Sequence, residues 1–191
     1  MEIRSIQKLT DLKWLNMFEV AYVDKSGRNR SWQVATRAKE PKCITKKFAM
    51  PDAVVIVPFH AAKNKMVITK EYRITLADFE YGFPAGLIDA GETIEQASRR
   101  ELKEETGLEV IRFTRISPSI YSSAGMSDES VAMVYVECEG NPSAARNTES
   151  EWIEVQLITP SQAARLCENP AIKFDAKAWL VLSGFAKYGH L

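Results

Sequence analysis

Three glutamates, Glu101, Glu104 and Glu105, stand within a turn and a half of one predicted helix, shortly after a glycine-rich turn. Like charges four residues apart destabilise a helix by about a few tenths of a kcal/mol. At about 100° per residue, Glu105 lies about 40° from Glu101 in one direction around the helix, and Glu104 lies about 60° from it in the other. The apolar residues Ile94 and Ala97 share that sector, which predicts that the three acids lie on the inward face.

Carboxylates on an inward face are costly unless a cation meets them. Arg100 lies close enough around the helix to pair with one of them, whereas Arg99 and Lys103 lie on the opposite side. A hard divalent cation such as Mg²⁺ would satisfy the rest, and it could polarise a phosphoryl oxygen and activate water. Helix composition alone favours a simpler interpretation, a solvated charged face, and the spacing by itself does not overturn it.

The elements around this helix can also be predicted. Thr93 and Gln96 form a capping-box pattern at its start, and Gly107 is placed to end it. Strand-like runs lie on both sides of this helix in the sequence, at residues 17–24, 31–38, 53–60, 66–73, 111–121, 131–139 and 152–158. Two further helices are predicted at residues 159–170 and 176–188. Pro160 lies in the first turn of the earlier one. Because strands and helices do not alternate regularly, the pattern predicts an α+β sandwich of a sheet between helices.

Composition excludes several classes of partner. The 191 residues contain 25 basic and 25 acidic side chains, so no net charge draws the chain to nucleic acid or to an anionic membrane. No stretch approaches the roughly 18 apolar residues of a membrane span, and the first ten residues lack the apolar run of a signal peptide. Three scattered cysteines, Cys43, Cys138 and Cys167, imply neither a metal site nor a disulfide framework. We therefore expect a reduced, cytoplasmic protein without nucleic-acid or membrane partners.

The complete spacing around the acidic helix resembles the Nudix box, G-x5-E-x7-R-E-U-x-E-E-x-G-U, where U is a bulky aliphatic residue. All nine specified positions match: Gly86, Glu92, Arg100, Glu101, Leu102, Glu104, Glu105, Gly107 and Leu108. The resemblance implies an α/β/α sandwich with a mixed sheet. It also implies hydrolysis of a nucleoside diphosphate linked to another group, with Mg²⁺ or Mn²⁺.

The resemblance also implies roles for individual residues. Glu101 and Glu105 would be the principal metal ligands, Glu104 would assist, and the carbonyl of Ala85 would be a further ligand. Arg100 and Glu92 would orient these groups, and Gly86 would lie against the bound substrate. The acidic inward face agrees with the first of these assignments.

Outside the box, "KEYR" at 70–73 and "PAGLID" at 84–89 resemble the ADP-ribose and nucleotide-sugar pyrophosphatases. That group has an N-terminal β-strand subdomain, here residues 1–50, which exchanges across a homodimer and contacts the nucleotide; residues 51–191 would be the catalytic domain. Arg73 matches a position that binds the diphosphate, although a surface arginine at a strand end explains it equally well. In the N-terminal hairpin, Trp32 and Phe18 are candidates for stacking on a purine.

Two positions depart from the ADP-ribose pattern. Gly82 replaces the glutamate of E-L-P-A-G, and Glu80 could substitute only if the loop shifted. Ala124 replaces the proline about sixteen residues after the box. These departures weaken ADP-ribose preference and keep sugar nucleotides such as GDP-mannose or ADP-glucose as alternatives.

The rest of that loop matches: Ser123 and Gly125 are expected to contact substrate, and Glu129 to reach the metal or the terminal sugar. A general base must still deprotonate the attacking water. The stretch 147–155 matches an acidic loop that supplies it in dimeric relatives, so Glu149 comes first, with Glu151 and Glu129 as alternatives.

The sequence thus predicts a metal-dependent pyrophosphatase that yields a nucleoside monophosphate and a sugar phosphate. A non-catalytic nucleotide sensor is a second class, but it would be expected to lose box acids that are all present here. A nucleoside triphosphatase or RNA-decapping enzyme is disfavoured by the N-terminal block and by the absence of a basic surface.

Overall fold

The computed structural model describes residues 1–145, 147 and 152–190, and it divides into two compact units. The N-terminal unit comprises Met1–Asp52 together with Ser119–Val131. The larger unit comprises Ala53–Pro118 and Ala132–Leu191. The chain therefore returns to the N-terminal unit after the acidic helix, a feature that the linear pattern did not suggest.

The N-terminal unit is built on a three-stranded antiparallel sheet in the order β1 (Glu2–Lys8), β2 (Asn16–Val23) and β3 (Asn29–Thr36). The predicted β2–β3 hairpin is confirmed. Its turn is fixed by the Asp24 carboxylate, which accepts hydrogen bonds from the amides of Ser26 and Arg28, and by Gly27 at a φ of 78°. Strand β1 was not predicted, because its residues are largely exposed at the sheet edge and show no clear alternation.

A connector and a returning segment complete this unit. The connector after β3 contains the short helix α1 (Lys42–Thr45), which was not predicted. In the returning segment, β9 (Ile120–Tyr121) pairs with the beginning of β10 (Ser130–Glu139). Ala35 of β3 forms an isolated parallel bridge to Ser127, so the returning segment lies along the edge of the small sheet.

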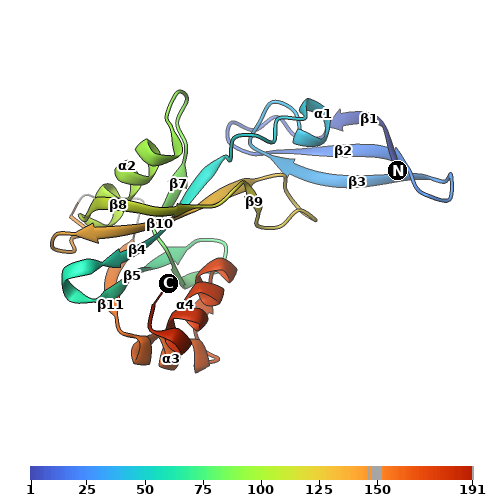
Figure 1. The fold of residues 1–191 in the computed structure, drawn as a ribbon. Coiled ribbons are helices and arrows are strands. Elements are labelled where there is room, and N and C mark those ends of the chain that lie inside the picture. Colours follow the sequence, from blue (N-terminus) through green and yellow to red (C-terminus); the bar gives the residue numbers. More distant parts are fainter. Residues whose placement is uncertain (146, 148–151, 191) are drawn as a thin grey trace. The chain divides into compact units, whose positions relative to one another are not determined.

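The larger unit is a mixed sheet between helices (Figure 1), which confirms the predicted fold class. Its main path runs β12-β6-β5-β4-β10-β8, with β11 paired to β5 and β7 to β4. The strands are β4 (Ala53–His60), β5 (Lys65–Arg73), β6 (Asp78–Gly82), β7 (Ala85–Leu87), β8 (Glu109–Ile116), β11 (Ile153–Ile158) and β12 (Lys173–Phe174), and a 3₁₀ turn, η1 (Ala61–Lys63), joins β4 to β5. The short strands β6, β7 and β12 were not predicted, because neighbouring strands rather than their own sequences hold them extended.

Helices cover both sides of this sheet. Helix α2 (Ile94–Thr106) packs on β4, β7 and β8, while α3 (Pro160–Glu168) packs against α4 (Ala176–Tyr188), which contacts β6. Under α2, a buried apolar cluster joins the helix to the sheet through residues that include Val54, Ile56, Val67, Leu102 and Val134. This packing fixes which side of α2 faces the sheet.

The ends of α2 are formed as predicted. The Thr93 side chain accepts a hydrogen bond from the Gln96 amide at 3.2 Å, and the Gln96 side chain accepts one from the Thr93 amide at 2.8 Å. Gly107 ends the helix at a φ of 71°, a left-handed conformation that favours glycine. Both ends of the acidic helix are therefore determined by local sequence.

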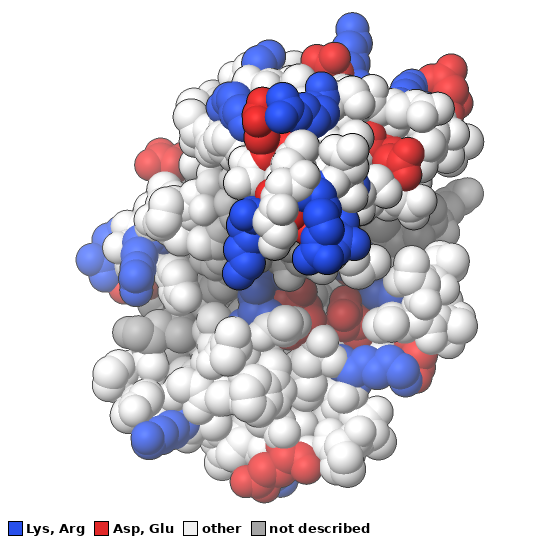
Figure 2. All heavy atoms as spheres, turned by 90° about the vertical axis from the view of Figure 1, so that its right-hand side faces the viewer, with Lys and Arg blue, Asp and Glu red and all other residues white. Residues whose placement is uncertain are grey.

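Surface charge agrees with the balanced composition. On the face drawn in Figure 2, basic and acidic side chains are interspersed. Within the described part of the chain, no helix is both long and apolar enough to cross a membrane.

Candidate active site

The three box glutamates of α2 do not share one environment. The Glu101 side chain is 12% exposed and Glu105 is half-buried, whereas the Glu104 side chain is 53% exposed. The prediction that all three lie on the inward face is therefore wrong for Glu104. The buried residues of α2 are Ala97, Ser98, Leu102 and Thr106. Around the helix axis, the centre of this buried face and Glu104 lie on opposite sides of Glu101.

Glu101 and Glu105 converge on one dipeptide of strand β7. A carboxylate oxygen of Glu105 accepts a hydrogen bond from the Ala85 amide at 3.2 Å. The Glu101 carboxylate lies so close to Gly86 that a Cβ there would be 1.9 Å from its Oε1. Pairing of Ala85 and Gly86 with β4 fixes this backbone. The glycine that opens the box is thus required by the close approach of a carboxylate.

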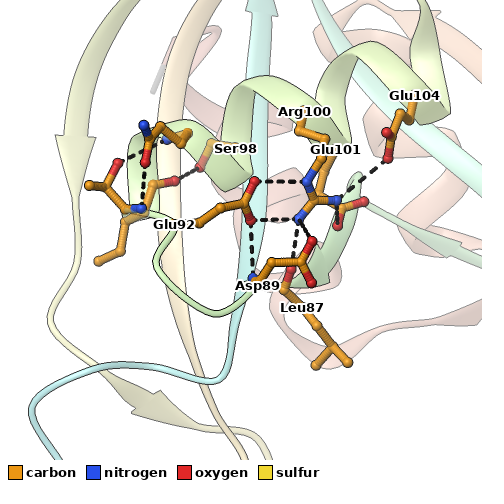
Figure 3. A network of polar contacts seen from close by, with 10 residues as sticks. Leu87, Asp89, Glu92, Ser98, Arg100, Glu101 and Glu104 are labelled. Atoms are coloured by element: carbon orange, nitrogen blue, oxygen red, sulfur yellow. Dashed lines mark hydrogen bonds and ion pairs between the residues drawn. The ribbon is translucent and has the colours of Figure 1, made fainter.

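Arg100 connects Glu92, Glu101 and Glu104 of the box (Figure 3). Its guanidinium donates to both carboxylate oxygens of Glu92, at 2.9 and 2.8 Å, and to Glu101 at 2.6 Å. It also donates to the Leu87 carbonyl at 3.0 Å and makes a longer contact of 3.5 Å with Glu104. The structure therefore brings together Glu92, Arg100 and Glu101, as the box spacing predicted.

Electrostatics in this network favour the charged forms. The hydrogen bonds from Arg100, aided by one from the Asp89 amide, lower the pKa of Glu92 from 4.5 to about 2. The hydrogen bonds that Arg100 donates to Glu92 and Glu101 raise the pKa of Arg100 above its ordinary value. Arg100 thus remains a permanent cation that holds Glu101 in place.

Arg73, at the end of β5, is paired within the larger unit. Its guanidinium donates to Glu71 at 2.7 Å and to Glu80 at 3.3 Å, and its side chain is about half exposed. Gly82, the first position that departs from the ADP-ribose pattern, lies on the neighbouring strand β6. A Cβ at Gly82 would meet only Thr69 Oγ1 at 3.8 Å, an ordinary contact. Neither packing nor backbone conformation therefore requires a glycine there.

The loop residues after the box lie in the N-terminal unit. Trp32 Nε1 donates to the Gly125 carbonyl at 3.1 Å, and Arg37 donates to the Glu129 carboxylate at 2.9 Å. The Ser123 carbonyl accepts hydrogen bonds from the amides of Met126 and Ser127, which closes a turn. Glu129 is therefore engaged with an arginine of its own unit.

The two aromatic candidates in the N-terminal hairpin differ in accessibility. Phe18 is only 3% exposed and packs in the core of the small sheet, so its proposed role in purine stacking is wrong. Trp32 is half exposed and borders a cavity of about 600 Å³ within the N-terminal unit. Lys42, Tyr121 and Ala124 also border this cavity, so the second departure from the ADP-ribose pattern lies in its wall.

The candidate bases Glu149 and Glu151 lie outside the described residues. Trp152, which begins the next described segment, stacks on Tyr72 with ring centroids 5.9 Å apart and meets Phe79 edge-to-face at 4.9 Å. Trp152 therefore packs against aromatic residues of β5 and β6. The burial of Lys42 was not predicted, because nothing in the residues around this lysine indicates that it is buried.

Comparison with known proteins identifies the family. The Nudix domain matches residues 50–180 of the chain. The chain belongs to the Nudix family of hydrolases. An ADP-ribose pyrophosphatase of Saccharomyces cerevisiae is 28% identical to it, over 100% of this chain and 85% of the yeast protein.

Two further comparisons agree with this family. The putative nudix hydrolase 2 of Caenorhabditis elegans is 33% identical, over 78% of this chain and 68% of its own length. A crystal structure of an ADP compounds hydrolase has the same fold, with a TM-score of 0.71 and 19% identity over 97% of this chain and 93% of that one. The likeness in fold to that structure therefore extends over nearly the whole chain, beyond the residues that the Nudix domain matches.

Nudix hydrolases use divalent metal ions, and the residues of this site fit such an ion. In the described part of the chain, no three His, Cys, Asp or Glu side chains are already arranged to hold a metal ion. In this structure the Glu101 carboxylate accepts a hydrogen bond from Arg100. Nevertheless, Glu101 and Glu105 are shielded carboxylates directed at the same dipeptide, Ala85–Gly86. Carboxylate and carbonyl oxygens are the ligands that Mg²⁺ takes. The site thus has suitable donors, and its glycine allows the Glu101 carboxylate to lie close to the backbone that carries the Ala85 carbonyl.

The first prediction concerns Gly86. A Gly86→Ala substitution would place a methyl group 1.9 Å from the Glu101 carboxylate and force that side chain away. We expect Mn²⁺ affinity, measured by calorimetric titration, to fall on the order of tenfold or more. Gly184→Ala is the matched control, because a Cβ at Gly184 in α4 meets nothing within 4 Å. Unchanged Mn²⁺ affinity in Gly86→Ala would contradict a metal site at this dipeptide.

The second prediction concerns pH. Because the pKa of Glu92 is about 2 in the folded protein and ordinarily 4.5, ionised Glu92 stabilises the fold above about pH 4.5. This contribution is lost as the pH falls from about 4.5 towards 2. In Glu92→Gln, the free energy of unfolding should therefore fall less steeply over this range than in the wild type, as measured by urea denaturation at stepped pH.

Glu168→Gln, a substitution at an exposed position at the end of α3, provides the control and should keep the wild-type slope. If Glu92→Gln also kept that slope, the link between Arg100 and Glu92 would not be a source of stability.

Proposed function

We propose that this Nudix hydrolase cleaves the diphosphate bridge of a nucleoside diphosphate linked to a sugar, ADP-ribose or a similar compound, with Mg²⁺ or Mn²⁺. The products are a nucleoside monophosphate and a sugar phosphate. The observation that carries the proposal is the convergence of Glu101 and Glu105 on Ala85–Gly86. The names of relatives support the substrate class: the yeast protein is an ADP-ribose pyrophosphatase, and a mouse protein 28% identical to this chain is an ADP-sugar pyrophosphatase.

In this proposal, Glu101 and Glu105 hold the cation together with the Ala85 carbonyl, and Glu104 assists from the exposed side of the helix. A cation held there would supply positive charge for the diphosphate and would lower the pKa of a bound water. Arg100 keeps Glu101 in its orientation, and Glu92 keeps Arg100 in its orientation through the paired hydrogen bonds.

Residues outside the helix complete the reaction. Arg73 binds the diphosphate after exchanging its contacts with Glu71 and Glu80 for phosphate oxygens, which bind a guanidinium in the same geometry as carboxylates. Glu149 takes the proton of the attacking water, with Glu151 and Glu129 as alternatives. Electrostatic stabilisation of the developing phosphate charge supplies most of the rate.

A sugar nucleotide such as GDP-mannose or ADP-glucose is the second candidate substrate. The observations that favour it are the absence of a side chain at Gly82, where a Cβ would make only an ordinary contact, and the small side chain of Ala124 in the wall of the N-terminal cavity. Both positions carry less side-chain bulk than the ADP-ribose pattern.

The third prediction tests substrate and metal together. ADP-ribose, GDP-mannose, ADP-glucose, reduced dinucleotides and nucleoside triphosphates are incubated with the protein, with and without Mg²⁺, and products are separated by chromatography. We expect metal-dependent cleavage of at least one diphosphate-linked compound to a nucleoside monophosphate. The absence of turnover for all of them with metal present would overturn the proposal.

Glu105→Gln should reduce kcat for the best substrate by more than about a hundredfold, because a neutral amide stabilises a cation poorly. Glu95→Gln, at an exposed position in the first turn of the same helix, should retain activity. Far-ultraviolet circular dichroism would verify that both variants are folded. Wild-type activity in Glu105→Gln would remove Glu105 from the ligand set.

The fourth prediction concerns assembly. We propose a homodimer formed through the N-terminal strands, whose edge strand β1 is largely exposed and bears Ile3 at its surface. Small-angle scattering over a concentration series should give a mass of twice the 21.5 kDa chain. A deletion of residues 1–8 should shift that mass towards a monomer, and a monomeric mass for the intact chain would exclude the dimer.

A further inference from the structure

Lys42 in the N-terminal unit is a buried lysine that the reaction does not use. Its side chain is only 8% exposed. Lysine is almost never buried without a partner, because removing an ammonium group from water is costly. The ammonium of Lys42 contacts the Asp52 carboxylate and donates to the Ser130 hydroxyl at 2.7 Å.

Asp52 and Ser130 are joined to each other as well. A single carboxylate oxygen of Asp52 accepts hydrogen bonds from the Ser130 amide at 2.7 Å and from its hydroxyl at 3.0 Å. The Asp52 amide in turn donates to the Ser130 carbonyl at 2.8 Å. Lys42, Asp52 and Ser130 thus form a closed polar network between the connector and the start of β10, and we refer to them as the lysine clasp.

The clasp lies at one end of the returning segment, Ser119–Val131. The Lys42 amide also donates to the Asp128 carboxylate at 2.7 Å, so the same residue contacts the segment at two points. Farther along, the segment is bonded to β3, where the Ala35 amide donates to the Met126 carbonyl at 2.8 Å. Trp32 and Arg37 bind Gly125 and Glu129, but these side chains are about half exposed.

Exposed polar pairs contribute little to holding a segment, because water competes for them and salt screens them. A buried ammonium behaves differently, since its loss leaves a carboxylate and a hydroxyl without the charge that they surround. Of the side chains described above that hold this segment, Lys42 is the one withdrawn from water. The position of the segment should therefore depend on Lys42 more than on Trp32 or Arg37.

We propose that Lys42 is a positioning residue: through Asp52 and Ser130 it fixes the segment that carries Ser123, Gly125 and Glu129. The effect on catalysis rests on the proposed function and on the expected contacts of Ser123 and Gly125 with its substrate. Lys42 touches neither the substrate nor the metal in this scheme. Its contribution is to order the substrate-binding segment before the substrate arrives, which lowers the cost of binding.

Lys42→Met separates charge from volume, because methionine keeps most of the unbranched stem and removes the ammonium. Lys39→Met is the matched control, since Lys39 is exposed and lies three residues away. Amide hydrogen exchange, read by mass spectrometry, reports on residues 119–131 without reference to activity. Steady-state kinetics on the best substrate then report kcat and KM.

We expect amide exchange in residues 119–131 of Lys42→Met to accelerate at least on the order of tenfold, while β4 and β5 exchange as in the wild type. KM should rise on the order of tenfold with kcat within about twofold, because substrate binding is affected and the metal site is not. Lys39→Met should change neither quantity. Exchange at the wild-type rate in Lys42→Met would overturn the proposal, since a lysine that only fills space is replaced by methionine without consequence.

The double variant Lys42→Met/Asp52→Asn separates positioning from general damage. Removing both charges leaves no uncompensated carboxylate, so the double variant should recover part of the protection and part of the KM that Lys42→Met loses. A double variant with additive losses would contradict the clasp.

If Lys42→Met accelerates exchange in β4 and β5 as well, Ser130→Ala decides the matter. This milder change removes one hydrogen bond of the clasp, and it must still loosen residues 119–131 selectively for the proposal to stand. Accelerated exchange with an unchanged KM would overturn the positioning role. A wild-type protein with no turnover would instead overturn the proposed function, and the exchange data would still decide whether the clasp holds the segment.

Discussion

The carboxylate of Glu101 lies against the backbone of Gly86, and the rest of the site is arranged around this contact. Helix α2 brings the carboxylate to β7 because Leu102 and its buried neighbours fix the rotation of the helix on the sheet. Arg100 then approaches Glu101 from the exposed side and is itself held by Glu92. Burial of apolar residues thus determines where the charges of the site lie.

The two compact units place charge in different surroundings. In the larger unit, Glu92, Glu101 and Arg100 of the box remain partly exposed to water. In the N-terminal unit, Lys42 is withdrawn from water and serves as an internal link between distant parts of the chain. Similar pairs of a cation and a carboxylate therefore differ between the two units in how far water reaches them.

Much of the fold and part of the site could be predicted from the sequence. The strands with continuous or alternating apolar residues, both ends of α2 and the pairing of Arg100 with Glu92 depend on residues close together in the chain. The exposure of Glu104 and the burial of Phe18 could not be predicted, because each depends on which neighbour covers the residue. Strands β7 and β12 were missed because they exist only beside a longer strand.

The sequence by itself determined the chemistry of this protein: nine box positions specify the Nudix family and the acids of its site. The spacing of residues along a helix is fixed by local backbone geometry, so it can be recognised in the sequence. Only the tertiary structure decided that Glu101 needs Gly86, and that Ser119–Val131 belongs with the first 52 residues. Contacts between residues far apart in the chain follow from packing, and neither residue alone carries a signal of the other.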